Sequence, residues 1–256
     1  MVLGVGIVAR FPIPRVNWSS SESLAAVAEA APRVPWEDFR EVMSWRSGEH
    51  VGMIGPTGQG KTTLMHAILG WTPFTTVFAT KPKDSSMSAL IRDDGYVRLP
   101  EWRTLNPVEF PKRIVWPDAM RMDSIELQKD VFTDAMAKIY VEGNWTVAID
   151  EAYYMSQILK MDKEIRQYLT QARALGISLL AGTQRPTWVP RELYTSATHL
   201  FFWRVNERTD LESIAGIGTL DSNIIRKIVP NLEQYQFLYI NTRTAYMARS
   251  KAPAPY

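Results

Sequence analysis

Short runs of apolar residues alternate along the chain with stretches in which apolar positions recur every three or four residues. The first pattern predicts buried strands and the second predicts amphipathic helices. We expect strands over residues 50–54, 75–79, 113–116, 145–151, 177–181, 198–203 and 235–240. Uninterrupted apolar strands separated by helices are typical of a parallel sheet covered on both sides. The pattern therefore predicts an α/β fold with a mostly parallel sheet and helices on both faces.

Among the helices predicted between these strands, three have clear sequence patterns. The first covers residues 63–69. The second begins at a capping box formed by Asp123 and Glu126, and its inward positions are Leu127, Val131, Ala135 and Ile139. The third, at 162–175, has two faces. Its apolar face holds Ile165, Tyr168, Leu169 and Ala172, and its polar face holds Lys163, Arg166, Thr170 and Arg173.

The ends of the chain are expected to differ from the middle. Residues 1–48 are interpreted as an arm and two helices that pack on the core, the first opened by a capping box at Ser19–Glu22 and the second by Pro35 and closed by Gly48. Residues 49–249 form the main domain in this interpretation. The prolines after Ser250 favour a loose tail over 250–256.

Composition narrows the possible chemistry. The 256 residues are 46% hydrophobic, which is ample for a core, and the net charge is only +2. Residues 160–191 nevertheless carry six Lys or Arg against two Asp or Glu, a pattern that fits a solvated face or a polyanion partner. The absence of cysteine excludes disulfides and thiolate chemistry. The three histidines lack metal-ligand spacing, so no zinc is expected.

No stretch of the sequence fits a membrane span or a secretion signal. The longest uncharged run, 62–80, contains Gly70, Pro73 and six threonines, which makes it unsuitable for crossing a bilayer. The residues before Arg10 do not form a signal peptide. We therefore expect a soluble, cytoplasmic protein.

One motif dominates the sequence. The pattern G-x-x-x-x-G-K-[ST] is matched at every fixed position by Gly55-Pro56-Thr57-Gly58-Gln59-Gly60-Lys61-Thr62. A predicted strand precedes it and a predicted helix follows, as a phosphate-binding loop requires, and this context argues against a chance match. We expect this loop and Thr63 to bind ATP, with Lys61 reaching the β- and γ-phosphates and Thr62 ligating Mg²⁺.

Two adjacent carboxylates end the strand at 145–151. Asp150 is positioned to hold the Mg²⁺ shell, and Glu151 is positioned to orient or deprotonate the attacking water. The alternative is that both residues only cap the next helix. Gln184 follows another buried strand, where its amide can contact the γ-phosphate; the alternative there is a solvated turn before Pro186.

A resemblance to a known superfamily rests on residues 171–186, Gln-Ala-Arg-Ala-Leu-Gly-Ile-Ser-Leu-Leu-Ala-Gly-Thr-Gln-Arg-Pro. This segment resembles the R-x-x-G-I-x-hydrophobic-T-Q-R-P segment of the FtsK/HerA superfamily of DNA-pumping ATPases, which includes viral genome-packaging ATPases. With Gly55–Thr62 and Val147–Glu151, the resemblance covers about residues 55–205 in the expected order. It is most specific in Thr-Gln-Arg-Pro.

The resemblance implies a RecA-like P-loop core, Mg-ATP, a hexameric ring and double-stranded DNA as partner. It also implies that Gln184 is the sensor glutamine and that Arg173 or Arg166 is the arginine finger. From the residues alone, Arg173 is one cation on a solvated helix face. The chain resembles a minimal motor of the packaging type, in the host cytoplasm or associated with a virion, and a viral portal or membrane partner would fit such a motor.

Other functions stay open at this point. A phage morphogenesis or secretion ATPase similar to the zonula-occludens-toxin family would share the loop and the carboxylates without acting on DNA. A nucleotide-dependent scaffold that never hydrolyses ATP and a small-molecule kinase are less favoured, because Glu151 is intact and no acceptor-site pattern is found. Stacking of adenine on Trp36 or Trp45 is a further open alternative.

Overall fold

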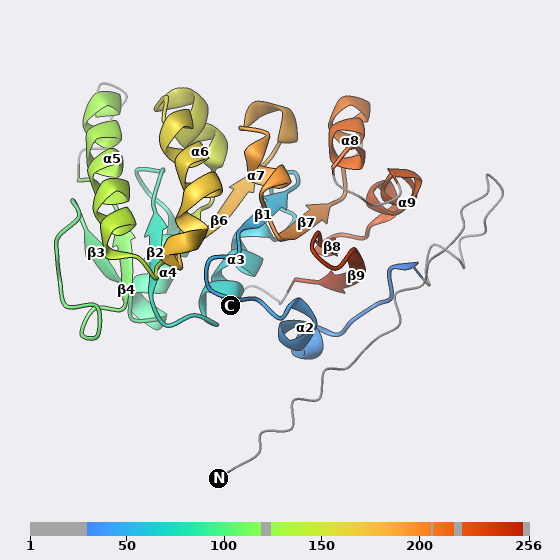
Figure 1. Ribbon diagram of the computed structural model, residues 1–256, viewed down its shortest axis with the longest axis horizontal. Helices are drawn as coiled ribbons and strands as arrows, with labels where there is room; N and C mark the ends of the chain where they lie inside the picture. The colour runs from blue at the N-terminus through green and yellow to red at the C-terminus, as the bar shows by residue number, and fades with distance from the viewer. Residues whose placement is uncertain (1–29, 119–123, 206, 218–221, 253–256) are drawn as a thin grey trace, which may run out of the picture.

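One sheet runs through the part of the chain that the computed structural model describes, residues 30–118, 124–205, 207–217 and 222–252 (Figure 1). Within these residues it has nine strands, in the order β3-β4-β2-β5-β6-β1-β7-β8-β9. Their bounds are β1 Val51–Ile54, β2 Thr75–Phe78, β3 Val97–Leu99, β4 Lys112–Val115, β5 Thr146–Ile149, β6 Ser178–Thr183, β7 His199–Trp203, β8 Gln236–Asn241 and β9 Tyr246–Lys251. All neighbouring pairs are parallel except β7–β8 and β8–β9.

The seven predicted strands are confirmed to within two residues at their ends, and two further strands were not predicted. The missed strand β3 has only three residues, with the exposed Arg98 in the middle. The missed strand β9 lies at an edge of the sheet and includes the polar residues Arg249, Ser250 and Lys251. Neither strand has the continuous apolar run that a strand in the middle of a parallel sheet requires.

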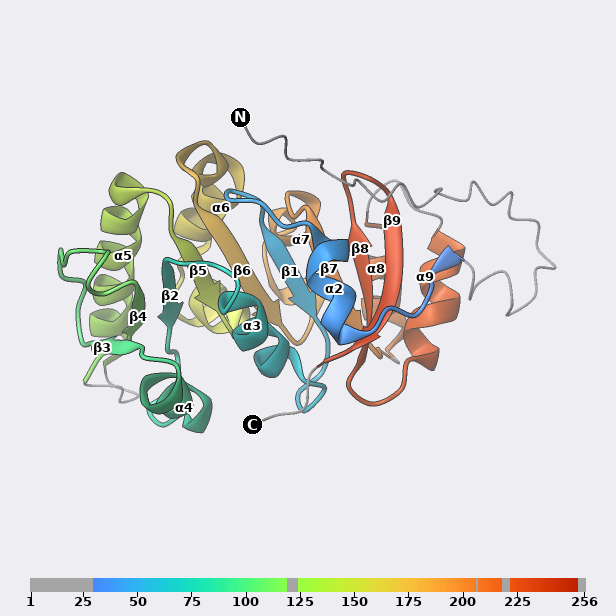
Figure 2. The same ribbon diagram turned by 90° about the horizontal axis from the view of Figure 1, so that it is seen from below.

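Helices cover both faces of the sheet, as predicted. The described helices are α2 Trp36–Met43, α3 Lys61–Leu69, α4 Ser85–Asp93, α5 Ile125–Glu142, α6 Asp162–Gln171, α7 Glu192–Thr195, α8 Arg208–Ala215 and α9 Ser222–Ile228. Figures 1 and 2 show α5, α6, α7 and α8 along one face and α2, α3 and α4 along the other. The architecture is a RecA-like α/β core.

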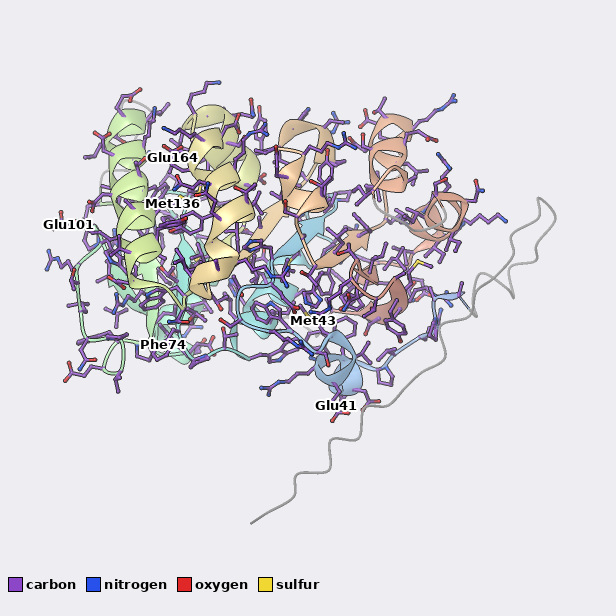
Figure 3. The ribbon with its side chains drawn as sticks, viewed as in Figure 1. Glu41, Met43, Phe74, Glu101, Met136 and Glu164 are labelled. Carbon is purple, nitrogen blue, oxygen red and sulfur yellow. The ribbon has the colours of Figure 1, made fainter. Side chains whose placement is uncertain are left out.

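Successive side chains of the central strands point to opposite faces of the sheet, so the hydrophobic core has one layer on each face. Val147 and Ile149 of β5 pack in the cluster that contains α5 and α6, whereas Ala148 packs with α3. On α2, Met43 points into the core and is fully buried, while Glu41 points away from it (Figure 3). Each strand therefore contributes side chains to both layers, which is why the central strands are apolar throughout.

The helix predictions need small corrections. Leu127, predicted to point inwards, is 49% exposed, because the buried face of α5 runs instead through Phe132, Ala135, Met136 and Ile139. Asp123 lies outside the described residues, and Ser124 occupies the N-cap position of α5. Both faces of α6 are as predicted, but the α-helix ends at Gln171 and a 3₁₀ turn continues over Ala172–Leu175.

The predictions for the two ends of the chain are tested only in part. Residues 1–29 lie outside the described residues, so the predicted arm and the helix opened at Ser19–Glu22 are not tested. The second helix starts after Pro35, but it ends at Ser44 in a left-handed conformation and not at Gly48. The loose tail is wrong for residues 250–252, because Ser250 and Lys251 pair with β8 and the Ala252 N–H donates to the Tyr235 carbonyl.

Candidate nucleotide-binding site

The phosphate-binding loop joins β1 to α3 at the carboxyl edge of the sheet. Gly58 and Gly60 have φ values of +76° and +94°, a conformation that other residues adopt only with strain. Gly60 is the N-cap of α3, and it lacks a capping side chain. The first N–H groups of α3 and the dipole of the helix therefore face the loop, an arrangement suited to an anion.

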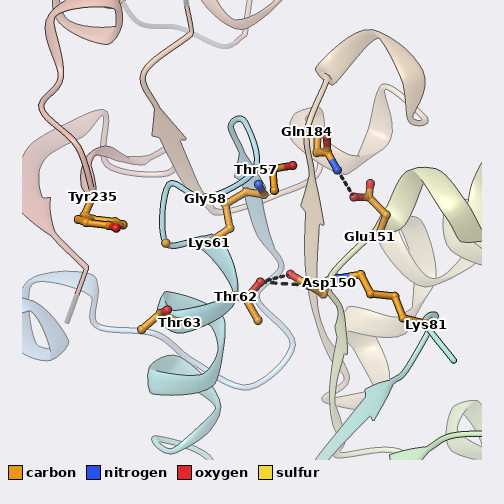
Figure 4. Close-up of a pocket in the computed structure, with 11 residues that line it drawn as sticks. Thr57, Gly58, Lys61, Thr62, Thr63, Lys81, Asp150, Glu151, Gln184 and Tyr235 are labelled. Carbon is orange, nitrogen blue, oxygen red and sulfur yellow. Dashed lines mark hydrogen bonds and ion pairs between the residues drawn. The ribbon is translucent and has the colours of Figure 1, made fainter. Parts of the chain in front are cut away.

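A cavity of about 280 Å³ opens around this loop (Figure 4). Its lining combines the loop with residues that follow β2, β5 and β6 and with one residue that precedes β8. The lining residues are Thr57, Gly58, Gly60, Lys61, Thr62, Thr63, Lys81, Asp150, Glu151, Gln184 and Tyr235. The structure thus brings the loop, both carboxylates and the glutamine into one site, as the sequence predicted.

The order of the strands explains this convergence. β6 lies between β1 and β5 and is parallel to both. The residues that follow these three strands therefore meet at one edge, with Gln184 between the loop and the carboxylates. The close approach requires Gly182, because a Cβ there would lie 2.6 Å from the Asp150 carbonyl oxygen.

Thr62 and Asp150 are directly hydrogen bonded. The Thr62 hydroxyl donates to both oxygens of the Asp150 carboxylate, at 2.9 and 3.0 Å. Lys81, in the segment after β2, lies 3.8 Å from Asp150 Oδ2 and 3.6 Å from Asp84 Oδ2. Since the hydroxyl oxygen keeps its lone pairs, Thr62 and Asp150 together present oxygen ligands of the kind that Mg²⁺ prefers.

Glu151 and Gln184 form a second pair in the cavity. The Gln184 amide donates to Glu151 Oε2 at 2.9 Å. Burial raises the pKa of the Glu151 carboxyl, and the nearby Asp150 charge adds to this effect, while the Gln184 hydrogen bond and the Lys61 charge oppose it. A carboxylate with a raised pKa is a better proton acceptor, which is the property that a general base needs.

Lys61 is buried in the loop. Its ammonium donates to the Pro56 carbonyl at 2.9 Å. Burial lowers the pKa of this amine, although the charges of Asp150 and Glu151 counteract part of the effect. The lysine is therefore held inside the loop as a compact cation next to the carboxylates, where phosphate groups would replace the Pro56 carbonyl as acceptors.

Neither candidate arginine lies in this cavity. Arg173, in the 3₁₀ turn after α6, is exposed and packs near Gly48, at the end of β1 opposite the loop. Arg166 is also exposed and forms an ion pair with Glu192. A role in the chain's own site is excluded for Arg173 by this position.

Two lining residues were not predicted to be part of the nucleotide site. Lys81 could have been found, because it follows a buried strand whose carboxyl edge favours ligands. Tyr235 gave no signal beyond its place at the start of a predicted strand, and β8 begins one residue later, at Gln236. Trp36 stacks on Phe39 and Trp71, and Trp45 donates to the Glu49 carbonyl, so both tryptophans serve packing and not the cavity.

The cationic stretch 160–191 is partly neutralised. Arg166 pairs with Glu192, and Arg185 pairs with Glu207 and Asp210. These carboxylates lie outside the stretch, so its local excess of positive charge is smaller in the fold than in the sequence.

Among the described residues, no helix is long and apolar enough to cross a membrane.

Comparisons with known proteins agree on the fold. No protein-family model and no curated protein matches the sequence. The DNA-packaging ATPase B204 of Sulfolobus turreted icosahedral virus is similar in structure, with a TM-score of 0.61 and 19% identity over 82% of this chain and 100% of that one. The genome packaging NTPase B204 of Sulfolobus turreted icosahedral virus 2, in complex with ATP-γS, gives 0.60 and 18% over 82% and 100%.

A more distant neighbour has the same core within a longer protein. The cytoplasmic domain of the type VII secretion ATPase EccC of Thermomonospora curvata has a TM-score of 0.53 and 15% identity, over 82% of this chain and 26% of that one. These similarities show that the chain has the fold of FtsK/HerA-type P-loop ATPases. The resemblance inferred from the sequence is confirmed at the level of the fold.

Proposed function

We propose that this protein is an ATPase that uses Mg-ATP hydrolysis to move double-stranded DNA, as a minimal genome-packaging or mobile-element motor. One observation carries the ATPase part of the proposal. A single cavity combines a phosphate-binding loop, the hydrogen-bonded pair Thr62–Asp150 and the hydrogen-bonded pair Glu151–Gln184. These are the parts that phosphoryl transfer to water requires.

The loop and the residues beside it bind the nucleotide in this proposal. The N–H groups at the start of α3 surround the phosphates, and Lys61 turns from the Pro56 carbonyl to the β- and γ-phosphates. Thr62 and Asp150 would hold Mg²⁺, which supplies positive charge to the transferring phosphoryl group when it is bound. Mg²⁺ takes few protein ligands, so one hydroxyl and one carboxylate are a suitable protein contribution to its shell.

Hydrolysis is assigned to the second pair. Glu151 orients the attacking water and accepts its proton, a role that its raised pKa favours. Gln184 contacts both Glu151 and the site of the γ-phosphate, so loss of that phosphate changes the partners available to its amide. The segment that follows Gln184 is thereby linked to the state of the nucleotide.

The DNA part of the proposal has separate support. The Thr-Gln-Arg-Pro segment at 183–186 resembles that of DNA-pumping ATPases. The proteins of similar fold include viral packaging ATPases over their full length. A homo-oligomeric ring, with a hexamer as the expected form, would allow Arg173 to reach the nucleotide of a neighbouring subunit.

The test is the ATPase rate with and without double-stranded DNA, alongside the mass in solution with nucleotide bound. We expect DNA of any sequence to raise the rate, with binding that weakens strongly as salt increases, since a motor must contact backbone phosphates at every register. Glu151→Gln serves as the control for contaminating ATPases. An ATPase rate that DNA leaves unchanged would favour the morphogenesis or secretion ATPase. Nucleotide binding without hydrolysis would favour a scaffold.

A further inference from the structure

Tyr235 lies at the nucleotide cavity and has no role in the chemistry described above. It is the residue immediately before β8, it lines the cavity, and it is 38% exposed. Its ring packs over the loop, because a Cβ built on Gly60 would lie 3.5 Å from Tyr235 Cδ1. The aromatic ring therefore lies against the phosphate-binding loop, on a partly exposed residue that borders the cavity.

The backbone holds this ring in a strained position. Tyr235 has φ +65°, which is unusual for a residue with a bulky side chain. The turn is fixed on both sides, since the Gln236 N–H donates to the Glu233 carbonyl at 3.1 Å and the Ala252 N–H donates to the Tyr235 carbonyl at 2.9 Å. Backbone strain of this kind persists only where surrounding contacts hold it, and it is frequent at binding sites.

The direction of a bound nucleotide follows from the two ends of the cavity. Glu151 and Gln184 lie on one side of the loop and mark the end where the terminal phosphate reacts. Figure 4 shows Tyr235 on the other side of the loop, beyond Thr63. A nucleotide with its phosphates in the loop would extend its ribose and base away from the carboxylates, towards the Tyr235 ring.

We propose that Tyr235 stacks on the base of the bound nucleotide and favours purines over pyrimidines. The larger ring system of a purine covers more of the tyrosine face, and stacking tolerates either purine because both present a flat π-surface. The inference rests on the proposed nucleotide binding and adds the residue that selects the class of base.

Binding of ADP, CDP and inorganic pyrophosphate, measured by calorimetry with Mg²⁺, tests the proposal without interference from hydrolysis. Tyr235→Leu keeps an apolar side chain over Gly60 but lacks the aromatic face. We expect it to weaken ADP binding by about 5- to 150-fold, the usual range for loss of one stacked base. It should bind pyrophosphate as tightly as the unmodified protein and lose most of the preference for ADP over CDP. Tyr235→Phe should retain both the affinity for ADP and the preference for ADP over CDP.

The possible outcomes separate this inference from the proposed function. If Tyr235→Leu weakens the binding of ADP and of pyrophosphate equally, the ring only supports the loop. If ADP binding is unchanged, the base lies elsewhere. Either result overturns the stacking proposal and leaves the ATPase proposal standing. If the unmodified protein binds neither ADP nor pyrophosphate, both proposals fail. Loss of ADP binding in Tyr235→Phe would replace stacking by a role of the hydroxyl.

Discussion

The side-chain amide of Gln184 donates a hydrogen bond to Glu151 Oε2 at 2.9 Å, across the gap between the ends of β6 and β5. This bond lowers the pKa of a carboxyl group that burial otherwise raises. It therefore keeps the proposed base ionised over a wider range of pH. In the proposed mechanism, the pair couples the group that activates water to the residue that senses the terminal phosphate.

Gln184→Ala is expected to change both the rate and its dependence on pH. Loss of the amide should lower kcat by about 10²-fold, as for other single hydrogen-bond donors at a reacting group. It should also raise the pKa of Glu151 further. Because hydrolysis needs the ionised carboxylate, the acid limb of kcat/KM should move to higher pH than in the unmodified protein. An acid limb that stays in place would show that this bond does not control the base.

Lys61→Ala and Glu151→Gln should separate binding from hydrolysis. Removal of Lys61 takes away the cation beside the phosphates, so ATP binding or hydrolysis should be lost. Glu151→Gln keeps the shape of the site and removes only the proton acceptor, so it should bind ATP normally and hydrolyse it about 10²- to 10⁴-fold more slowly. Nucleotide affinity and single-turnover rates measure the two effects, and near-normal turnover by Glu151→Gln would assign the base to another residue.

Gly182→Ala tests the packing that brings the carboxylates to the loop. The added Cβ would lie 2.6 Å from the Asp150 carbonyl oxygen, a backbone atom that cannot move alone. Overpacking of this kind costs about 1–3 kcal/mol, and the displaced end of β5 should also slow hydrolysis. Gly216→Ala is the control, because its Cβ would meet nothing closer than 3.4 Å. Thermal unfolding and ATPase assays would refute the argument if the two variants behaved alike.

The sequence predicted most of the site because its residues follow apolar strands. Asp150, Glu151 and Gln184 are each attached to a run that must be buried, and parallel strands deliver their next residues to one edge. Tyr235 could not be found in this way, because it precedes its strand and reaches the edge only through the antiparallel pairing of β8 with β7. Such pairing depends on contacts between distant segments, which no local pattern records.

The polar face predicted for residues 162–175 gave the right orientation for Arg173, but only the fold shows where that arginine lies. The Cβ that Gly48 lacks would lie 3.3 Å from Arg173 Cγ, and Gly48 precedes β1, whereas the phosphate-binding loop follows it. Within the described residues no ion pair joins Arg173 to a carboxylate, while Arg166 is paired with Glu192. Arg173 is thus the better candidate for a group that acts on the nucleotide of a neighbouring subunit.

Arg173→Ala should therefore retain nucleotide affinity and hydrolyse ATP poorly, since an arginine supplied to the transferring phosphate contributes about 10³- to 10⁵-fold to kcat. Lys163→Ala, on the exposed face of α6 before the 3₁₀ turn that holds Arg173, is the matched control and should hydrolyse normally. Specific activity of the unmodified protein should fall on dilution, because the proposed site is complete only between subunits.

A mixture of Arg173→Ala with Glu151→Gln gives the sharpest test of that shared site. Each variant lacks a different half of the shared site. Activity can return only at an interface between the two variants. There the Arg173→Ala subunit binds ATP and keeps its base, and the Glu151→Gln subunit supplies the arginine. The mixture should then be more active than either variant alone, because no such interface exists in a ring made of one variant only. If mixing restores nothing and dilution leaves the specific activity unchanged, Arg173 does not act across subunits, and the positive charge on the transferring phosphate must come from within the chain that binds it.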